Sequence, residues 1–355
     1  MTSHRAQPTD QRQRAQRWPL SGLLALVVVF VFLSTVPHAF LWDDEQFVLQ
    51  NRFLTSWRFF WPLLTENVVA GAGLESNLYR PLQSLTHFLD VQLWGYRPWG
   101  HHASNLLFHV AASVAVFRLL NRLYPGWPAG LTAMMFSLHP LQSEAVAYIS
   151  GRGDTLAILC LCLGLLCAHE HRWLSLGFAA LAIASKESLT LFPVFLWLYT
   201  QAAQRRLPLT RHLPFWILSG GYVVARLTVL NFQNTLNFYK EPNLLTEHVH
   251  VRLYTYLTTL PKGLLLWLWP TDLHHERSWL VYPTFTTPAV WGAALFVASL
   301  LALAVWLSRR TPRATIGLWW FFIATIPTSN LFVLINALFY DHWFLLPGVG
   351  LALVA

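Results

Sequence analysis

A few carboxylate and cationic side chains lie between the apolar runs of a chain that is otherwise largely apolar. Asp43 and Asp44 directly follow the first long apolar run, Arg80 lies in the loop beyond it, and Arg152 and Lys186 sit between later apolar runs. A carboxylate can serve as a general base, and arginine or lysine can hold an anion by charge-assisted hydrogen bonds. The alternative is a simple polar membrane boundary, because charge at membrane depth costs at least ~2.5–3.5 kcal/mol per residue. That alternative suits Arg152 and Lys186 least, since both sit tightly between apolar segments.

Histidines offer a second kind of chemistry. His102 and His109 are seven residues apart and could share a helix face with Asn105, as metal ligands often do. No carboxylate or third histidine is fixed beside them by the local sequence, so interfacial hydrogen bonding is the favoured interpretation. The pair His274 and His275 carries less weight still. We therefore assign no metal ligand and no cofactor from sequence.

The composition defines the class of protein that must position these groups. Hydrophobic residues make up 55% of the 355 residues and charged residues only 11%, against roughly 25% charged in a soluble domain. These figures exclude a disordered chain, a nucleic-acid-binding domain and an ordinary cytosolic enzyme. They predict an all-α polytopic membrane protein. Cys160, Cys162 and Cys167 lie in one apolar run and are interpreted as core residues, without a disulfide or zinc framework.

Apolar runs near the length of a spanning helix, about 20 residues, recur along the chain. The candidate spans are 20–41, 103–117, 129–148, 155–168, 173–184, 188–200, 213–230, 289–307, 316–334 and the run that begins at 343. With softer segments counted, they predict about 10–11 transmembrane helices. Residues 42–100 form a long first outer loop.

Arginine placement orients the chain. If residues 1–19 are cytoplasmic, the arginine-rich segments fall on the cytoplasmic side, as the positive-inside rule requires. These arginines are Arg5, Arg12, Arg14, Arg17, Arg118, Arg122, Arg172, Arg205, Arg206, Arg211, Arg309, Arg310 and Arg313. The polar clusters then share the outer face.

Two segments in the second half need separate treatment. The run 253–270 contains Pro261 and Lys262, and a single crossing there would move the arginines at 309–313 outside. We expect it to be re-entrant or interfacial, with a plain span as the alternative. The run 343–355 would form a helix of only roughly 20 Å, short of the ~30 Å hydrocarbon core. This shortness predicts a C-terminus truncated inside a membrane helix.

Taken in order, the polar motifs resemble the membrane part of the GT-C glycosyltransferases. The nearest pattern is that of the transmembrane O-mannosyltransferases with tetratricopeptide repeats and their bacterial relatives. The resemblance covers about residues 42–347. It rests on Asp43-Asp44, Asn51, Tyr79-Arg80-Pro81, Asn105 with His109, His139-Pro140 with Glu144, Gly151-Arg152 with Asp154, and Lys186-Glu187.

The resemblance implies a GT-C-like membrane domain over residues 20–355. It further implies transfer of a sugar, such as mannose, from a polyprenyl-phosphate carrier to a protein Ser or Thr hydroxyl on the outer face. Asp43 would be the general base in an inverting reaction, and Asp44 would orient the acceptor or replace Asp43 as base. A divalent metal linking the two aspartates is left open.

The remaining motif residues fall into two groups under this resemblance. The donor phosphate would be held by Arg80, Arg152, Lys186, Arg226 and His342. The residues that contact the sugar or acceptor, or that hold those cations in place, would be His102, Asn105, Glu144, Asp154, Glu187 and Asp341.

Two departures from the family pattern keep alternatives open. Asp341-His342 stands where the family usually has Glu-Arg, and no helical repeats follow the membrane part. The alternatives are a same-fold transferase to a lipid or glycan acceptor, a non-catalytic scaffold, and a transporter. The expected location is a bacterial inner membrane with a periplasmic active site, or else the endoplasmic reticulum membrane. The expected partners are the lipid-linked sugar donor, the acceptor and the bilayer, without nucleic acid.

Overall fold

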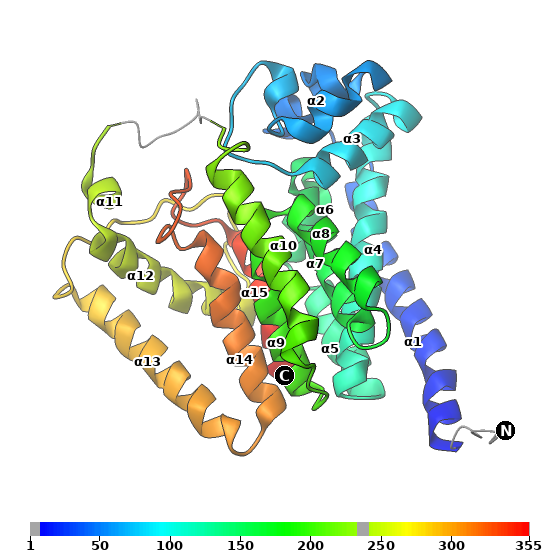
Figure 1. The fold of residues 1–355 in the computed structure, drawn as a ribbon, viewed down its shortest axis with the longest axis vertical. Helices are drawn as coiled ribbons and strands as arrows, with labels where there is room; N and C mark the ends of the chain where they lie inside the picture. Colours follow the sequence, from blue (N-terminus) through cyan, green and yellow to red (C-terminus); the bar gives the residue numbers. More distant parts are fainter. Residues whose placement is uncertain (1–7, 233–240, 355) are drawn as a thin grey trace.

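The computed structural model describes residues 8–232 and 241–354, and these form an all-helical bundle with no β-strand among them (Figure 1). The expected all-α membrane class is therefore confirmed. The α-helices are α1 Pro8–Phe32, α2 Phe60–Thr65, α3 Pro81–Trp94, α4 Pro98–Leu123, α5 Trp127–Ser137, α6 Gln142–Ala147, α7 Arg152–Cys167, α8 Arg172–Ser185, α9 Phe192–Ala202, α10 Leu209–Leu227, α11 Leu244–Glu247, α12 Val249–Leu268, α13 Pro288–Ser308, α14 Pro312–Thr325 and α15 Leu345–Val354.

Three helical segments of the described chain are long and apolar enough to cross a membrane: α4, the segment Ile149–Cys167 that includes α7, and α13. Shorter apolar helices cover Pro19–Thr35, Arg172–Ser185, Thr315–Thr328 and Asp341–Val354. The most apolar window of the α7 segment is 78% buried in the protein, whereas that of α13 is only 22% buried. A buried central helix and an outer helix that exposes apolar side chains are what a bundle surrounded by lipid requires. The predicted total of spans stays a prediction.

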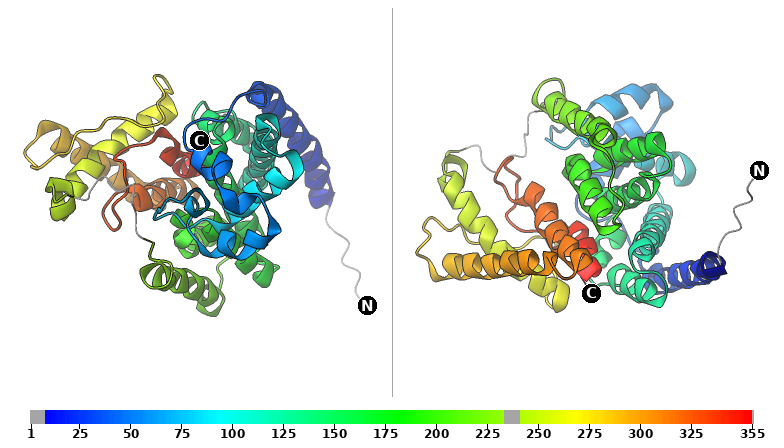
Figure 2. Two further views of the ribbon diagram at one scale, coloured as in Figure 1. Left: turned by 90° about the horizontal axis from the view of Figure 1, so that it is seen from above. Right: turned by 60° about the horizontal axis from the view of Figure 1, so that its bottom comes forward.

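The helices pack in two connected groups. Helix α4 contacts α7, and α7 contacts α8, while α14 lies against α15 and α9 (Figures 1 and 2). Helices α12 and α13 form an arm on the other side, where α13 also touches α14. In Figure 1, α12 lies across the direction of α10 and α14. The prediction that 253–270 is re-entrant or interfacial concerns this helix, and it stays a prediction.

The first outer loop is a folded element. Between α1 and α4 the chain forms short helices, including α2 and α3, that cap one end of the bundle (Figure 1). Phe47, Val48, Leu54, Leu63 and Phe88 are buried together in an apolar cluster that also includes Ile149. Burial of large apolar side chains stabilises such an element by about 1.5–3 kcal/mol per side chain. The cluster therefore fixes the segment that carries Asp43 and Asp44 against the start of α7.

The predicted span 129–148 is wrong as a single helix. Helix α5 ends at Ser137, and α6 begins only at Gln142. Pro140 lacks a backbone N–H and its ring clashes with the preceding turn, which favours a break in the helix at this point. The backbone N–H of Leu141 instead donates to Nδ1 of His139 at 3.2 Å. The break turns Glu144 out of the bundle and into a surface cavity.

Other predicted boundaries shift for the same reason. Helix α1 ends at Phe32 and is followed only by the short helical turn Leu33–Thr35, ahead of Pro37, so the predicted span 20–41 is too long at its C-terminal side. Helix α14 ends at Thr325 and continues only as the turn Ile326–Thr328, which contains Pro327, instead of reaching 334. In the predicted cytoplasmic segment 1–19, residues 1–7, with Arg5, lie outside the described residues.

Candidate active site

Adjacent aspartates at the end of the first span face different surroundings. Asp44 is fully buried, and its Oδ1 accepts the backbone N–H of Ser150 at 2.7 Å and the Ser150 hydroxyl at 2.6 Å. Its Oδ2 accepts the backbone N–H of Leu41 at 2.9 Å. Burial raises the pKa of Asp44, although these hydrogen bonds act in the opposite direction. Asp43 is exposed.

The backbone turns sharply just before the pair. Trp42 has a φ of +44°, in the left-handed region that bulky residues rarely adopt. Its indole packs on His275 with ring centroids 4.4 Å apart, and it also contacts the Tyr148 ring edge-on at 6.5 Å. These contacts hold the turn in place, so that Asp44 points into the protein while Asp43 stays exposed.

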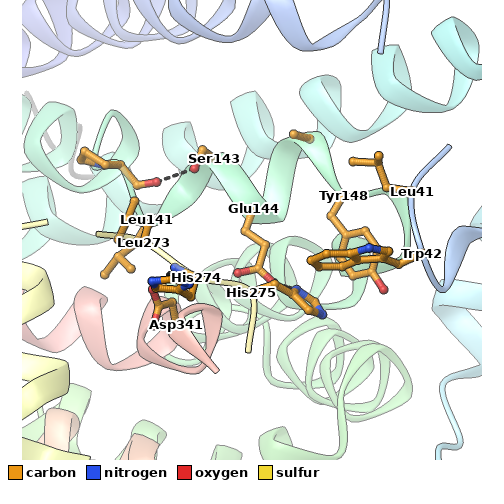
Figure 3. A pocket seen from close by; sticks show the side chains of 12 residues that line it. Leu41, Trp42, Leu141, Ser143, Glu144, Tyr148, Leu273, His274, His275 and Asp341 are labelled. Carbon is orange, nitrogen blue, oxygen red and sulfur yellow. Dashed lines mark hydrogen bonds and ion pairs between the residues drawn. The ribbon is translucent and has the colours of Figure 1, made fainter. Parts of the chain in front are cut away.

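A cavity of about 370 Å³ opens beside this turn (Figure 3). Trp42, Glu144, Tyr148, His275 and Asp341 are among the side chains that line it. Burial, together with the charge of Asp43, raises the pKa of Tyr148. Burial and the charges of Glu276, Asp43 and Glu144 raise the pKa of Tyr340 in the same way. Asp43 therefore lies close enough to the cavity to act electrostatically on two phenols at its edge.

Glu144 lines this cavity close to His275 (Figure 3) and is the centre of a polar cluster. Its Oε1 lies 2.5 Å from Nδ1 of His275 and 2.7 Å from Nδ1 of His342. Partial burial raises the pKa of Glu144, but the two imidazoles outweigh that effect and lower it to about 2. His342, predicted to contact phosphate, is thus brought together with Glu144.

Asp341, the neighbour of His342, has a structural partner that the sequence did not suggest. Nε and Nη2 of Arg277 donate to its two carboxylate oxygens at 2.6 and 3.0 Å, and the backbone N–H of His274 donates to it at 2.7 Å. This arginine lies 64 residues away from Asp341 in the sequence. No local motif marks Arg277, which sequence inspection missed, and His275 was considered only as half of a histidine pair that was given little weight.

Arg152 lies behind the cavity in a fully buried network. Its Nη2 is 2.6 Å from Asp90 Oδ2, its Nε donates to Asn105 Oδ1 at 2.6 Å, and Nη2 also donates to the carbonyl of His101 at 3.0 Å. Asn105 in turn donates to the Tyr148 carbonyl at 3.1 Å. The guanidinium joins α3, α4 and α7 and does not line the cavity, so its predicted phosphate contact has no support from this geometry.

His102 is likewise inside the protein. It is fully buried, and its Nε2 lies 3.3 Å from the carbonyl of Ala39. The other histidine of that predicted pair, His109, lies 3.0 Å from the carbonyl of Ser137. Both contacts agree with the hydrogen-bonding interpretation of the pair.

Two predicted cations and two predicted carboxylates gather in a second group at the same end of the bundle. Arg80 forms a two-pronged ion pair with Glu187, at 2.9 and 2.7 Å, and Lys186 pairs with Asp154. Burial raises the pKa of Glu187, but the Arg80 guanidinium outweighs it and lowers that pKa to about 2. These pairs connect α3, α7 and the turn after α8.

Arg226 adjoins this second group. Its guanidinium donates to the side chain and carbonyl of Asn77 and to the carbonyl of Leu230. The Tyr222 hydroxyl lies within the electrostatic reach of Glu187, Arg226 and Arg80. Among the described residues this buried hydroxyl has no hydrogen-bond partner. The structure thus brings Arg80, Lys186 and Arg226 together, and it places His342 against Glu144.

Fold and site define an all-helical membrane protein with acidic, imidazole and cationic groups gathered at one end of its bundle. Comparison with known proteins finds relatives that are all named as protein O-mannosyl-transferases. A stretch of 146 residues is 32% identical to Protein O-mannosyl-transferase TMTC2 of Mus musculus, covering 40% of this chain and 17% of the mouse protein. A longer match of 372 residues, 21% identical, joins 97% of the chain to 52% of Protein O-mannosyl-transferase F38B6.6 of Caenorhabditis elegans. Protein O-mannosyl-transferase Tmtc1 of Drosophila melanogaster is 31% identical over 156 residues.

These matches cover about a sixth to about half of the relatives' own lengths. No family model matches the chain, and no solved structure matches it. The resemblance to O-mannosyltransferases is supported at this modest identity, and a bacterial origin is not.

Proposed function

We propose that this chain is the membrane part of a glycosyltransferase that moves a sugar, with mannose the leading candidate, from a polyprenyl-phosphate carrier to a Ser or Thr hydroxyl of a protein. The names of the relatives support the reaction class. A donor whose lipid tail stays in the bilayer suits a site at the end of a membrane bundle. The observation that carries the proposal is that Asp44 is buried and hydrogen-bonded, whereas its neighbour Asp43 is exposed.

Asp43 is the general base in this proposal. The buried Asp44 accepts three hydrogen bonds and ties the loop to α7, whereas Asp43 is exposed beside the cavity. Asp43 takes the proton of the acceptor hydroxyl while that oxygen attacks the anomeric carbon of the sugar. The bond from that carbon to the phosphate oxygen breaks, and polyprenyl phosphate leaves with the electron pair. Attack from the side opposite the leaving group inverts the anomeric carbon.

The donor phosphate binds near Arg226, with Arg80 and Lys186 close by. Arg80 and Lys186 are already balanced by Glu187 and Asp154, whereas the hydrogen-bond partners found for Arg226 within the described residues are all uncharged. Its positive charge and the unpaired Tyr222 hydroxyl suit a phosphate group. Preorganised charge that stabilises the departing phosphate lowers the barrier for transfer.

The site lies on the non-cytoplasmic side of the membrane in this proposal. The predicted cytoplasmic arginines flank the helix ends opposite α2 and α3, and the positive-inside rule places such ends in the cytoplasm. Arg122, at the end of α4, lies 3.5 Å from Glu170 in the turn between α7 and α8, so these ends share one level. A bacterial inner membrane remains the first choice and the endoplasmic reticulum membrane the second.

A donor-consumption assay tests the function. The full chain in membrane vesicles receives radiolabelled polyprenyl-phosphate mannose and a Ser/Thr-rich peptide, and the labelled peptide is measured. We expect Asp43→Asn to lower transfer by about 10²–10⁴-fold. The matched control Glu45→Gln, an exposed carboxylate two residues on, should retain transfer. Full activity of Asp43→Asn would exclude Asp43 as base, and absence of transfer from every lipid-linked sugar offered would overturn the proposed function.

A further inference from the structure

Three potential metal ligands converge at the edge of the cavity from distant parts of the chain. They are Oε1 of Glu144 in α6, Nδ1 of His275 in the segment before α13, and Nδ1 of His342 in the helical turn Asp341–Phe344. These atoms all lie within 4.8 Å of one another. All three side chains are partly exposed, at 18–20%, so an ion can reach them from the cavity. Figure 3 shows Glu144 and His275 pointing toward each other.

We propose that Glu144, His275 and His342 form a binding site for a divalent transition-metal ion, with Zn²⁺ the best fit. Two imidazoles and one carboxylate are a common protein ligand set for zinc where a fourth position is left open. Imidazole nitrogen favours Zn²⁺ and its neighbours in the transition series over Mg²⁺ and Ca²⁺, which prefer oxygen ligands. The fourth position here faces the cavity.

The observed spacing is compatible with metal entry after a small adjustment. Ligand atoms about 2.0–2.1 Å from a tetrahedral zinc ion lie about 3.3 Å from one another. The Glu144–His275 and Glu144–His342 separations of 2.5 and 2.7 Å would therefore widen by about 0.6–0.8 Å. In the metal-free state each Nδ1 must carry a proton to donate to the shared carboxylate oxygen. A metal ion replaces these protons with coordinate bonds and satisfies all three groups at once.

The local charges also distinguish this cluster from the other histidine–carboxylate group. His87, Asp90 and His101 lie equally close together, but Arg152 already places a positive charge 2.6 Å from Asp90. A metal ion there would be repelled by the guanidinium. At Glu144 the arginine of the adjoining segment, Arg277, is paired with Asp341. The carboxylate of Glu144 thus keeps its charge for a cation.

The position of the site suggests its use, and this step rests on the proposed function. The open position of the metal ion faces the same cavity that Asp43 adjoins, where the acceptor hydroxyl could contribute an oxygen ligand. The metal ion would then make that hydroxyl easier to deprotonate, as metal ions do for bound water. Metal binding itself follows from the geometry of the three side chains and does not depend on that function.

Metal titration of the purified chain in detergent tests the site, with Zn²⁺ and Co²⁺ as the only probes. After treatment with a chelator, the chain should bind one equivalent of Zn²⁺ by calorimetry. His275→Gln and His342→Gln should each weaken binding by more than the about 10–100-fold typical of losing an outer partner of a metal ligand. His274→Gln is the matched control, because His274 is adjacent, half exposed and paired with Asp272 at 2.9 Å. It should bind like the parent chain.

A further variant distinguishes loss of a metal ligand from loss of the folded structure. His342→Cys should still bind Co²⁺ and should add a thiolate-to-cobalt charge-transfer band in the near ultraviolet, which a merely structural side chain would not produce. Equal Zn²⁺ affinity in His274→Gln and His275→Gln, or Co²⁺ binding by His342→Cys without that band, would overturn the proposal. If the chain binds the metal ion but transfers no sugar, the metal site is supported and only the proposed function is contradicted. Full transfer by the metal-free chain would exclude a part for the metal in the reaction.

Discussion

Ser150 and Asp44 are joined twice, since both the backbone N–H and the hydroxyl of Ser150 donate to the same carboxylate oxygen, at 2.7 and 2.6 Å. The two residues are 106 positions apart in sequence. Their contact fastens the first outer element to the start of the central helix α7. It also leaves Asp43 as the exposed one of the two neighbouring aspartates, because Asp44 is buried where it holds the chain together.

We expect Asp44→Ala to destabilise the protein by about 1–3 kcal/mol, because it leaves the buried N–H and hydroxyl groups of Ser150 unsatisfied. The thermal unfolding midpoint of the detergent-solubilised protein measures this effect. Asp43→Ala, which removes an exposed carboxylate, should leave the midpoint nearly unchanged. Equal midpoints for the two variants would contradict a structural role for Asp44.

Removing one partner of the buried pair Arg152–Asp90 should destabilise the protein more than removing both partners together. Arg152→Met alone leaves Asp90 buried without its 2.6 Å partner, and such losses cost about 3–5 kcal/mol. The double variant Arg152→Met with Asp90→Leu removes both charges and should recover much of the lost midpoint. If the double variant is as unstable as the sum of its single variants, the pair is not coupled as the structure indicates.

Stability should fall in acid partly through Glu187. The pKa of this carboxyl is about 2 in the folded protein against an ordinary value of 4.5. Since the folded pKa is the lower one, ionised Glu187 stabilises the protein above about pH 4.5, and that contribution is lost as the pH falls toward 2. Glu187→Gln should therefore flatten the decline of the unfolding midpoint between pH 5 and 3. Glu66→Gln, at an exposed position, should leave the decline as steep as in the parent chain.

If Arg226 contacts the donor phosphate, Arg226→Gln should raise the KM for the lipid-linked sugar by about 10- to 100-fold. This range follows from about 1.5–3 kcal/mol for a hydrogen bond to a charged group. Because the same charge also faces the leaving group, kcat should fall as well, though less. Arg58→Gln, which removes an exposed arginine stacked on Phe59, is the control. Unchanged KM and kcat in Arg226→Gln would place the phosphate elsewhere.

Orientation can be read by labelling single cysteines in whole cells with a membrane-impermeant maleimide. The parent for this experiment replaces Cys160, Cys162 and Cys167 with alanine. Glu66→Cys, in the first outer element, should react in intact cells. Arg206→Cys, after α9, should react only once the membrane is opened. The reverse pattern would put the cavity in the cytoplasm.

Helical class and membrane character could be predicted from composition and from runs of apolar residues, because both are local properties. The break between α5 and α6 could also have been predicted, since Pro140 stands inside the run that was taken as one span. Ranking Asp43 against Asp44 could not, because the partner that buries Asp44 is Ser150, far along the chain. His275 was discounted and Arg277 was missed for the same reason: their importance comes from Glu144 and Asp341, which only folding brings near them.

Position 42 requires both a left-handed backbone conformation and an aromatic ring over His275, and no single replacement of Trp42 provides both without strain. Glycine would adopt that backbone conformation freely, yet it has no ring to cover His275 and close the cavity wall. Phenylalanine or tyrosine would restore the wall and keep the conformational cost, about 1–3 kcal/mol. Tolerance to substitution here should therefore be narrow and confined to aromatic residues, even though the Trp42 side chain is 67% exposed.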